Sequence, residues 1–169
     1  LLKMAEEAEA FKCVIDPDAT DFLSHGDMPS FIRTYCERTQ QHVPKTHSEI
    51  ARCCLESLAL RYRWVLEALE HLTNRKLTTI RIVGGGSQNK LLNQFTADAC
   101  NREVVTGPVE ATALGNIMMQ AVATGHIKDL TAGRKAIAAS VQQETFTPNH
   151  SPAWDKAFET FKGLLEQSK

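Results

Sequence analysis

The sequence lacks the features that mark several specialised classes of protein. No apolar run approaches the ~20 residues of a membrane-spanning helix, and the chain start has no signal-peptide pattern. Neither sign of charge dominates, because 19 lysines and arginines balance 20 acidic residues for a net charge of -1. A phosphate backbone would need a basic excess, so we expect no nucleic-acid partner. We expect a globular α/β protein in the cytoplasm, without membrane contact.

The sequence also has no two cysteines at the short spacing that is typical of metal sites. The sequence has five cysteines and no CxxC spacing, so we expect reduced thiols and no metal ligands. These cysteines are Cys13, Cys36, Cys53, Cys54 and Cys100. Cys36 and Cys53 lie on consecutive predicted helices, which makes a disulfide between them geometrically feasible. A reducing cytoplasm disfavours a permanent one, and both states stay open.

The clearest element is a long amphipathic helix in the first half of the chain. Thr46 and Glu49 have the spacing of a capping box, and the apolar period continues to about Asn74. The residues expected to face the core along it are Ile50, Cys54, Leu58, Tyr62, Val65, Leu69 and Leu72.

The segment before that helix is predicted to hold a helix over 1–12, a loop, and a helix beginning near Pro29. The loop is rich in acids: Asp16, Asp18, Asp21 and Asp27. Their spacing lacks the glycine and glutamate of an EF-hand, so we interpret them as turn-forming and helix-capping residues. Asp27 is predicted to cap the following helix.

The second half alternates strands and helices. Strands are expected at 79–83 and 103–105, and helices follow each of them, the second beginning near Ala111 and ending at Gly125. A further helix is expected at 131–143, and a terminal helix places Trp154, Phe158, Phe161 and Leu165 on one stripe. Two strands cannot form a self-sufficient sheet, so we expect the rest of the fold to lie outside the chain.

Gly84, Gly85 and Gly86 form the first candidate site. A strand that delivers glycines into a helix N-terminus offers free N–H groups to a phosphate, although such a turn can also be a plain connection. Ser87 and Gln88 follow where a Walker A loop needs lysine, and the dinucleotide fingerprint lacks its third glycine. A second glycine, Gly115, lies inside a helix, where we expect it to allow close packing.

Two segments, 80–100 and 107–116, resemble the carboxy-terminal domain of the FGGY carbohydrate kinases, and the rhamnulokinases among them most closely. Further matches lie at Asp16–Asp18, Phe22–Leu23, Ile50–Cys53, Glu56–Leu60 and Phe146–Asn149. The resemblance implies a ribonuclease H-like, actin-type ATPase domain, truncated and helix-rich with few strands, occupying all of 1–169. It implies ATP or ADP with Mg²⁺ as cofactor.

The resemblance also assigns roles to residues. It implies that Gly85 and Asn89, with Gly84 and Gly86 beside them, contact the nucleotide. The family's catalytic aspartate matches no residue here, so the chain is expected to be the nucleotide side of an ATP-dependent kinase acting on L-rhamnulose, inactive alone. An absent amino-terminal domain would hold the sugar and most magnesium ligands.

Two other readings stay open at this point. The chain could be a stand-alone, non-catalytic module that binds a nucleotide or a partner, or a packing unit alone. In either case the sheet edges and apolar faces that the resemblance leaves uncovered predict self-association of the chain.

Overall fold

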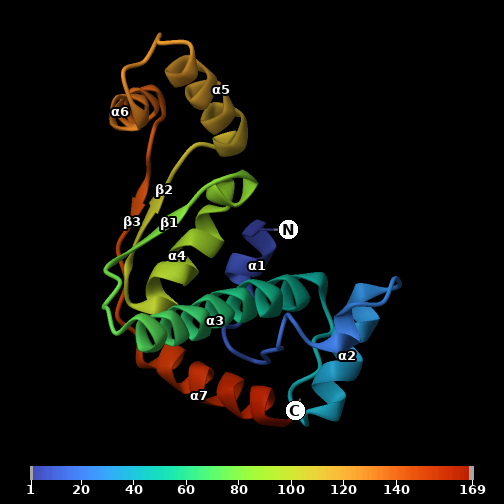
Figure 1. Cartoon of the computed structure of the whole chain (residues 1–169). Coiled ribbons are helices and arrows are strands. Elements are labelled where there is room, and N and C mark those ends of the chain that lie inside the picture. Colours follow the sequence, from blue (N-terminus) through green and yellow to red (C-terminus); the bar gives the residue numbers. More distant parts are fainter. Residues whose placement is uncertain (1, 168–169) are drawn as a thin grey trace.

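Helix α3 (His47–Thr73) is the longest element of the described chain, and α1, α4 and α7 pack against it (Figure 1). The computed structural model describes residues 2–167. Thr46 Oγ1 accepts the N–H of Glu49 at 3.2 Å, and Glu49 Oε2 accepts the N–H of Thr46 at 3.2 Å, so the predicted capping box is confirmed. Asn74 ends the helix in the left-handed conformation, with φ 49°.

The predicted core face of α3 is confirmed at Ile50, is only partly buried at Cys54 and Leu58, and is wrong in the second half of the helix. Tyr62, Val65, Leu69 and Leu72 are exposed, the last at 80%. The buried residues are Ile50, Cys53, Leu55, Glu56, Ser57, Ala59, Leu60 and Leu66. Helices α1, α4 and α7 all contact α3, and the apolar period alone does not reveal which faces receive them.

The first helix is shorter than predicted. It ends at Glu7 instead of continuing to residue 12, because Phe11 has φ 57° and turns the chain back along α3. The next helix begins at Met28 after Asp27, but the Asp27 side chain makes no capping bond to the backbone and accepts the hydroxyl of Ser30 instead. The elements of this region are α1 (Leu2–Glu7), η1 (Thr20–Phe22) and α2 (Met28–Arg38).

A three-stranded sheet lies beside α4 (Lys90–Cys100). Strand β1 (Thr79–Ile82) pairs in parallel with β2 (Glu103–Thr106), from Thr79↔Glu103 to Ile82↔Thr106. Strand β3 (Thr145–Phe146) pairs antiparallel with β2. Sequence analysis predicted two strands and missed β3, which has only two residues and no period of its own.

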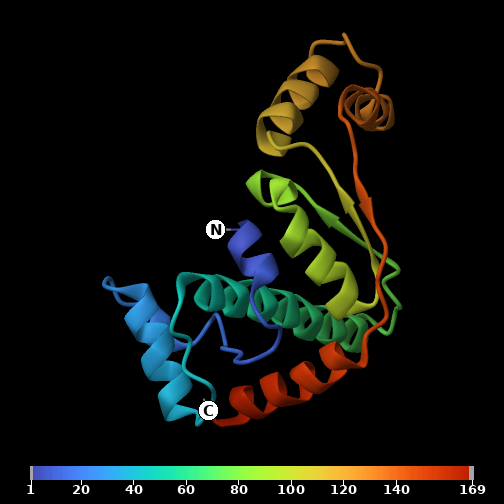
Figure 2. The same ribbon diagram turned by 180° about the vertical axis from the view of Figure 1, so that it is seen from behind.

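The core surrounds α3 and is completed by residues of the N-terminal segment, α2, α4 and α7 (Pro152–Gln167) (Figure 2). The predicted aromatic stripe of α7 is confirmed, with Phe161 and Phe158 at 0% and 2% exposure. The Trp154 ring meets Phe11 edge-on at 4.7 Å and Phe95 at 5.5 Å between ring centroids. Leu165 is only partly buried, and Leu164 takes the buried position.

Helices α5 (Ala111–Ala123) and α6 (Leu130–Ser140) form a lobe at the end of the molecule remote from α7 (Figures 1 and 2). Nothing in α5 is buried, and Gly133 is the buried residue of α6. A Cβ on Gly133 would come within 2.5 Å of Met118 Cγ, so α6 approaches α5 closely there. Gly115 has nothing within 4 Å of a Cβ, so the close packing predicted at Gly115 is wrong.

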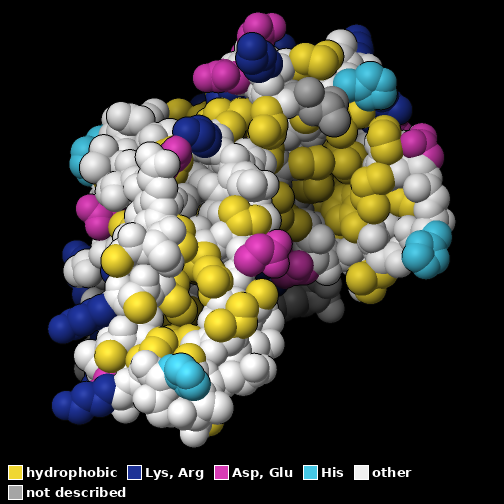
Figure 3. All heavy atoms as spheres, turned by 90° about the horizontal axis from the view of Figure 1, so that it is seen from above, with side chains coloured by type: hydrophobic (Ala, Val, Ile, Leu, Met, Phe, Trp, Pro, Cys, Tyr) yellow, Lys and Arg dark blue, Asp and Glu magenta, His cyan; other side chains and the backbone are white. Residues whose placement is uncertain are grey.

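Large apolar side chains remain on the surface. Figure 3 shows hydrophobic side chains gathered in a recess of one face and scattered elsewhere over it. Those with more than half of their surface exposed are Leu23, Leu72, Val83, Ile117 and Met119. Self-association through such surfaces stays a prediction. Over the described residues, no helix combines the length and apolarity needed to cross a membrane.

Candidate functional site

The glycine loop joins β1 to α4. Gly84 has φ 79°, a conformation that L side chains rarely adopt, so glycine is required at this position. A single 3-10 turn, η2 (Gly85–Gln88), follows. Asn89 then caps α4, because its Oδ1 accepts the N–H of Leu92 at 3.1 Å.

A second glycine turn, after β2, is bonded to the first one. The N–H of Gly107 donates to the Ile82 carbonyl at 2.8 Å, and the N–H of Gly84 donates to the Pro108 carbonyl at 3.0 Å. A Cβ on Gly107 would meet Val83 Cγ1 at 2.8 Å, so only glycine fits this contact. Both turns lie at the carboxyl ends of parallel strands, where open α/β sheets bind their ligands.

The glycine loop presents unpaired N–H groups. Among the described residues, no acceptor is found for the N–H groups of Gly85 and Gly86, and both glycines are exposed. The loop is held from beneath, because Ser87 Oγ donates to the Gly84 carbonyl at 2.7 Å and Asn93 Nδ2 donates to the Ser87 carbonyl at 2.9 Å. Nothing lies within 4 Å of a Cβ built on Gly85, so there is open space beside the loop at this residue.

A hollow of about 280 Å³ adjoins the loop. It is lined by Ser87, Gln88, Lys90, Thr106, Gly107, Val109, Val141, Gln142 and Glu144. Lys90 brings a positive charge to the hollow and pairs with Glu144 at 2.6 Å. Free N–H groups, a lysine and a helix N-terminus favour a negatively charged ligand such as a phosphate.

The structure brings the four predicted site residues, Gly84, Gly85, Gly86 and Asn89, into one loop. The Nδ2 group of Asn89 is unpaired, since no acceptor for it is found among the described residues. Sequence reasoning missed Lys90 and the segment 141–144. Lys90 directly follows the loop and could have been included, whereas 141–144 arrives from a distant part of the chain and gives no local signal.

The acidic loop forms turns, as predicted. Asp16 Oδ1 accepts the N–H of Asp18 at 3.1 Å, which is the bond of an Asx turn. Asp16 is buried, its N–H donates to the Tyr35 hydroxyl at 3.2 Å, and its carboxylate lies 3.8 Å from Arg61. These acids lie beside α2, on the other side of α3 from the sheet (Figure 1).

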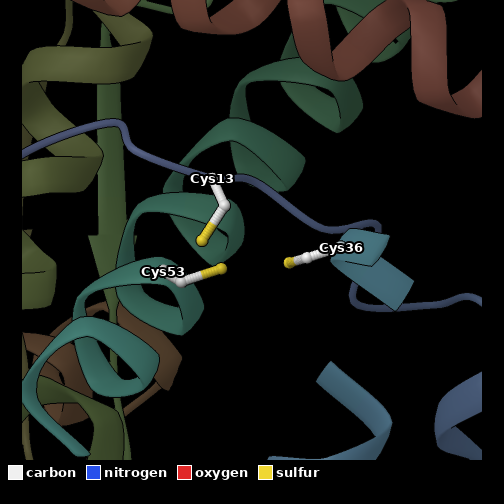
Figure 4. A group of neighbouring side chains, drawn as sticks. All are labelled: Cys13, Cys36 and Cys53. Carbon is white, nitrogen blue, oxygen red and sulfur yellow. The ribbon is translucent and has the colours of Figure 1, made fainter. Parts of the chain in front are cut away.

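All five cysteines are free thiols, so Cys36 and Cys53 form no disulfide in this structure. Their sulfurs lie beside that of Cys13, a residue that sequence reasoning left ungrouped (Figure 4). Cys13 gave no signal because its neighbours depend on the path of the chain after α1.

Comparison with known proteins identifies the family to which the chain belongs. The sequence model of the FGGY family of carbohydrate kinases, C-terminal domain, matches residues 1–124. A rhamnulokinase of Bacteroides thetaiotaomicron is 46% identical over 98% of this chain, and one of Enterococcus faecalis is 47% identical over 88%. The chain spans about a third of these relatives, 34% and 31% of their lengths.

Solved structures agree on the fold. Glycerol kinase of Plasmodium falciparum, solved with ADP, matches this chain with a TM-score of 0.62 at 18% identity. The match covers 99% of this chain and 32% of the glycerol kinase. Xylulose kinase of Rhodospirillum rubrum matches 75% of the chain and 26% of that protein, with a TM-score of 0.60 at 22% identity. The predicted fold class is confirmed, and the chain belongs to the FGGY family of carbohydrate kinases as part of their C-terminal domain.

Proposed function

We propose that this chain forms the nucleotide-binding side of an ATP-dependent carbohydrate kinase that converts L-rhamnulose to L-rhamnulose 1-phosphate. Membership of the FGGY family supports the kinase reaction. The two rhamnulokinase relatives, at 46% and 47% identity, support the choice of sugar. The observation that carries nucleotide binding is the glycine loop, with its open N–H groups at the carboxyl ends of two parallel strands.

Each group at the loop has a role in this proposal. The N–H groups of Gly85 and Gly86 donate to phosphate oxygens of the nucleotide, and Asn89 Nδ2 adds a side-chain donor. Lys90 and the N-terminus of α4 supply positive potential to the same place. Phosphoryl transfer depends on positioning and on neutralising phosphate charge, and these groups provide both on the ATP side.

The remaining parts of the reaction are placed outside this chain. Kinases of this type need a carboxylate that accepts the proton of the sugar hydroxyl, and magnesium that shields the phosphates. Asp27 is bonded to Ser30 and lies by α2, far along the molecule from the glycine loop. Glu110 precedes α5 without a side-chain capping bond. We therefore assign the base, the sugar pocket and the magnesium ligands to the remainder of the kinase.

The variant Gly85→Val tests the nucleotide loop. In the full-length kinase we expect ADP affinity, measured by calorimetry, to fall at least about tenfold, because an isopropyl group covers the open N–H groups. The fold should persist, since nothing lies within 4 Å of a Cβ at Gly85. Gly163→Val on α7 is the matched control, because that glycine also faces open space. Unchanged ADP affinity in Gly85→Val would overturn the assignment.

The division of labour is tested with a coupled ADP-release assay on this chain and on the full-length kinase. We expect rhamnulose-dependent turnover by the full-length protein and only background by the chain alone, because groups that act as a unit fail together. Turnover by the chain alone would place a catalytic base between residues 1 and 169, with Asp27 and Glu110 as the candidates. A full-length protein that ignores rhamnulose but accepts another ketose would overturn the choice of sugar alone.

A further inference from the structure

Three thiols from three separate segments meet inside the protein, far from the glycine loop. Cys13 belongs to the extended segment after α1, Cys36 to the last turns of α2, and Cys53 to the first turns of α3. Their side chains converge on one another (Figure 4). The three sulfur atoms all lie within 4.8 Å of one another. The residues are 4%, 0% and 2% exposed, so the cluster is shielded from bulk water.

The spacing of these sulfurs suits a single metal ion. A thiolate lies about 2.3 Å from zinc, so three thiolates around one ion are separated by about 4 Å from each other. The observed limit of 4.8 Å needs only side-chain adjustments of less than about 1 Å to reach that geometry. Because the ligands come from three segments, an ion at their centre would fix the ends of two helices and the N-terminal segment together.

Cysteine binds metal ions as the thiolate, so an ion that enters this cluster displaces the thiol protons.

The surroundings limit which ions fit. The donors are sulfur only, and no fourth histidine, cysteine or carboxylate joins the group among the described residues. Sulfur donors select soft ions, and three-coordinate sites suit Cu⁺, whereas Zn²⁺ takes a fourth ligand. A small hollow of about 10 Å³ borders Cys13 and Cys53, close to the space that one water needs. A water there would complete a zinc site.

We propose that Cys13, Cys36 and Cys53 form a binding site for one soft, thiophilic metal ion, Zn²⁺ or Cu⁺. Binding is a ligand exchange: the ion gives up water, the three cysteines bind it as thiolates, and the protons of their thiols are released to solvent. No electron is transferred. The role is structural, because the site joins α2 and α3 to the segment after α1.

The test uses the full 169-residue chain and the full-length kinase, stripped of metal and kept reduced. Each is titrated with Zn²⁺ and, in a separate anaerobic arm, with Cu⁺. We expect one equivalent of at least one ion to stay bound through gel filtration, to raise the thermal midpoint, and to release protons measurable in weakly buffered solution. Whichever ion binds at one equivalent identifies the site as copper or zinc.

Variants assign the binding to these residues. Cys36→Ser and Cys13→Ala should each weaken metal affinity at least about a hundredfold, because each removes one of three thiolates. Cys54→Ala is the matched control, because Cys54 adjoins Cys53 in sequence but lies outside the cluster. The metal affinity of this variant should equal that of the unchanged chain. Circular dichroism of the metal-free variants shows that they fold.

Three results would overturn the proposal. The first is that neither ion binds at one equivalent to the reduced chain. The second is that binding survives in both Cys36→Ser and Cys13→Ala. The third is that two of the three thiols form a disulfide in air, while the reduced protein takes up no metal. If Cys54→Ala lowered the metal affinity as much as Cys36→Ser, the metal would bind at a place other than this cluster.

Discussion

The body around α3 and the α5–α6 lobe are packed very differently, although α5 is more apolar than the helices of the body. Phe161 of α7 is fully buried, whereas Ile117 of α5 is 63% exposed. No residue of α5 is buried at all. The contrast teaches that an apolar helix is buried only where other elements cover it, and the described chain provides cover for α7 and not for α5. Four substitution experiments probe this contrast, in order of decreasing expected effect.

The largest effect is expected from removing a ring in the core. Phe161→Ala should lower the free energy of unfolding by about 3–5 kcal/mol, because it leaves a cavity where the side chain is fully buried. Ile117→Ala, in the lobe, should change it by no more than about 0.5 kcal/mol. Urea unfolding of both variants measures the difference. Equal losses would mean that the lobe is packed as tightly as the core.

The junction between the two regions should show an intermediate effect. Gly107→Ala should cost about 1–3 kcal/mol, because its Cβ would lie 2.8 Å from Val83 Cγ1. Gly85→Ala, in the same glycine turns but with open space around it, should be nearly neutral for stability. The two thermal midpoints give the comparison. A neutral Gly107→Ala would show that the turns can separate freely.

Equivalent helix caps in the two regions give a finer comparison. Thr46 caps α3 and Asp129 caps α6, where Asp129 Oδ1 accepts the N–H of Ala132 at 2.8 Å. Thr46→Ala should lower global stability by about 1 kcal/mol. Asp129→Ala removes a similar bond, but its effect should appear as faster amide exchange confined to α6. Slower global refolding or a global loss in Asp129→Ala would contradict the separation of the lobe.

The smallest effect concerns a buried carboxyl in the core. Burial raises the pKa of Glu56 above its usual 4.5, although Arg52 Nε donates to it at 2.6 Å. The folded chain therefore binds this proton more tightly than the unfolded chain, and stability falls as pH rises from about 4.5 through the folded pKa. Glu56→Gln should flatten that part of the profile. Parallel profiles for the two proteins would refute a raised pKa.

Local signals in the sequence predicted much of the fold. The capping box at Thr46 and the glycine run at Gly84 each act through neighbours within a few residues, so the start of α3 and the candidate loop could be derived from spacing. The same holds for the stripe on α7, whose period matches one covered face.

Features that depend on distant segments could not be derived. Strand β3 exists because residues 145 and 146 reach β2, and the core face of α3 depends on where α4 and α7 pack. The thiol cluster needs the turn at Phe11, which brings Cys13 onto α3. In each case the deciding contact spans tens of residues, beyond the reach of any local period.

The pair of hydrogen bonds between the two glycine turns has a mechanical consequence. The chain enters the lobe from Gly107 and Pro108, and it returns beside Thr106, whose N–H donates to the Glu144 carbonyl at 2.9 Å. The two chain segments that connect the lobe to the sheet are thus attached along one edge of the sheet, and that edge also forms a wall of the hollow next to the glycine loop. Rotation of the lobe as a unit must pivot on this edge. Swinging the lobe about this edge therefore changes the width of the hollow, since residues on both connections line it.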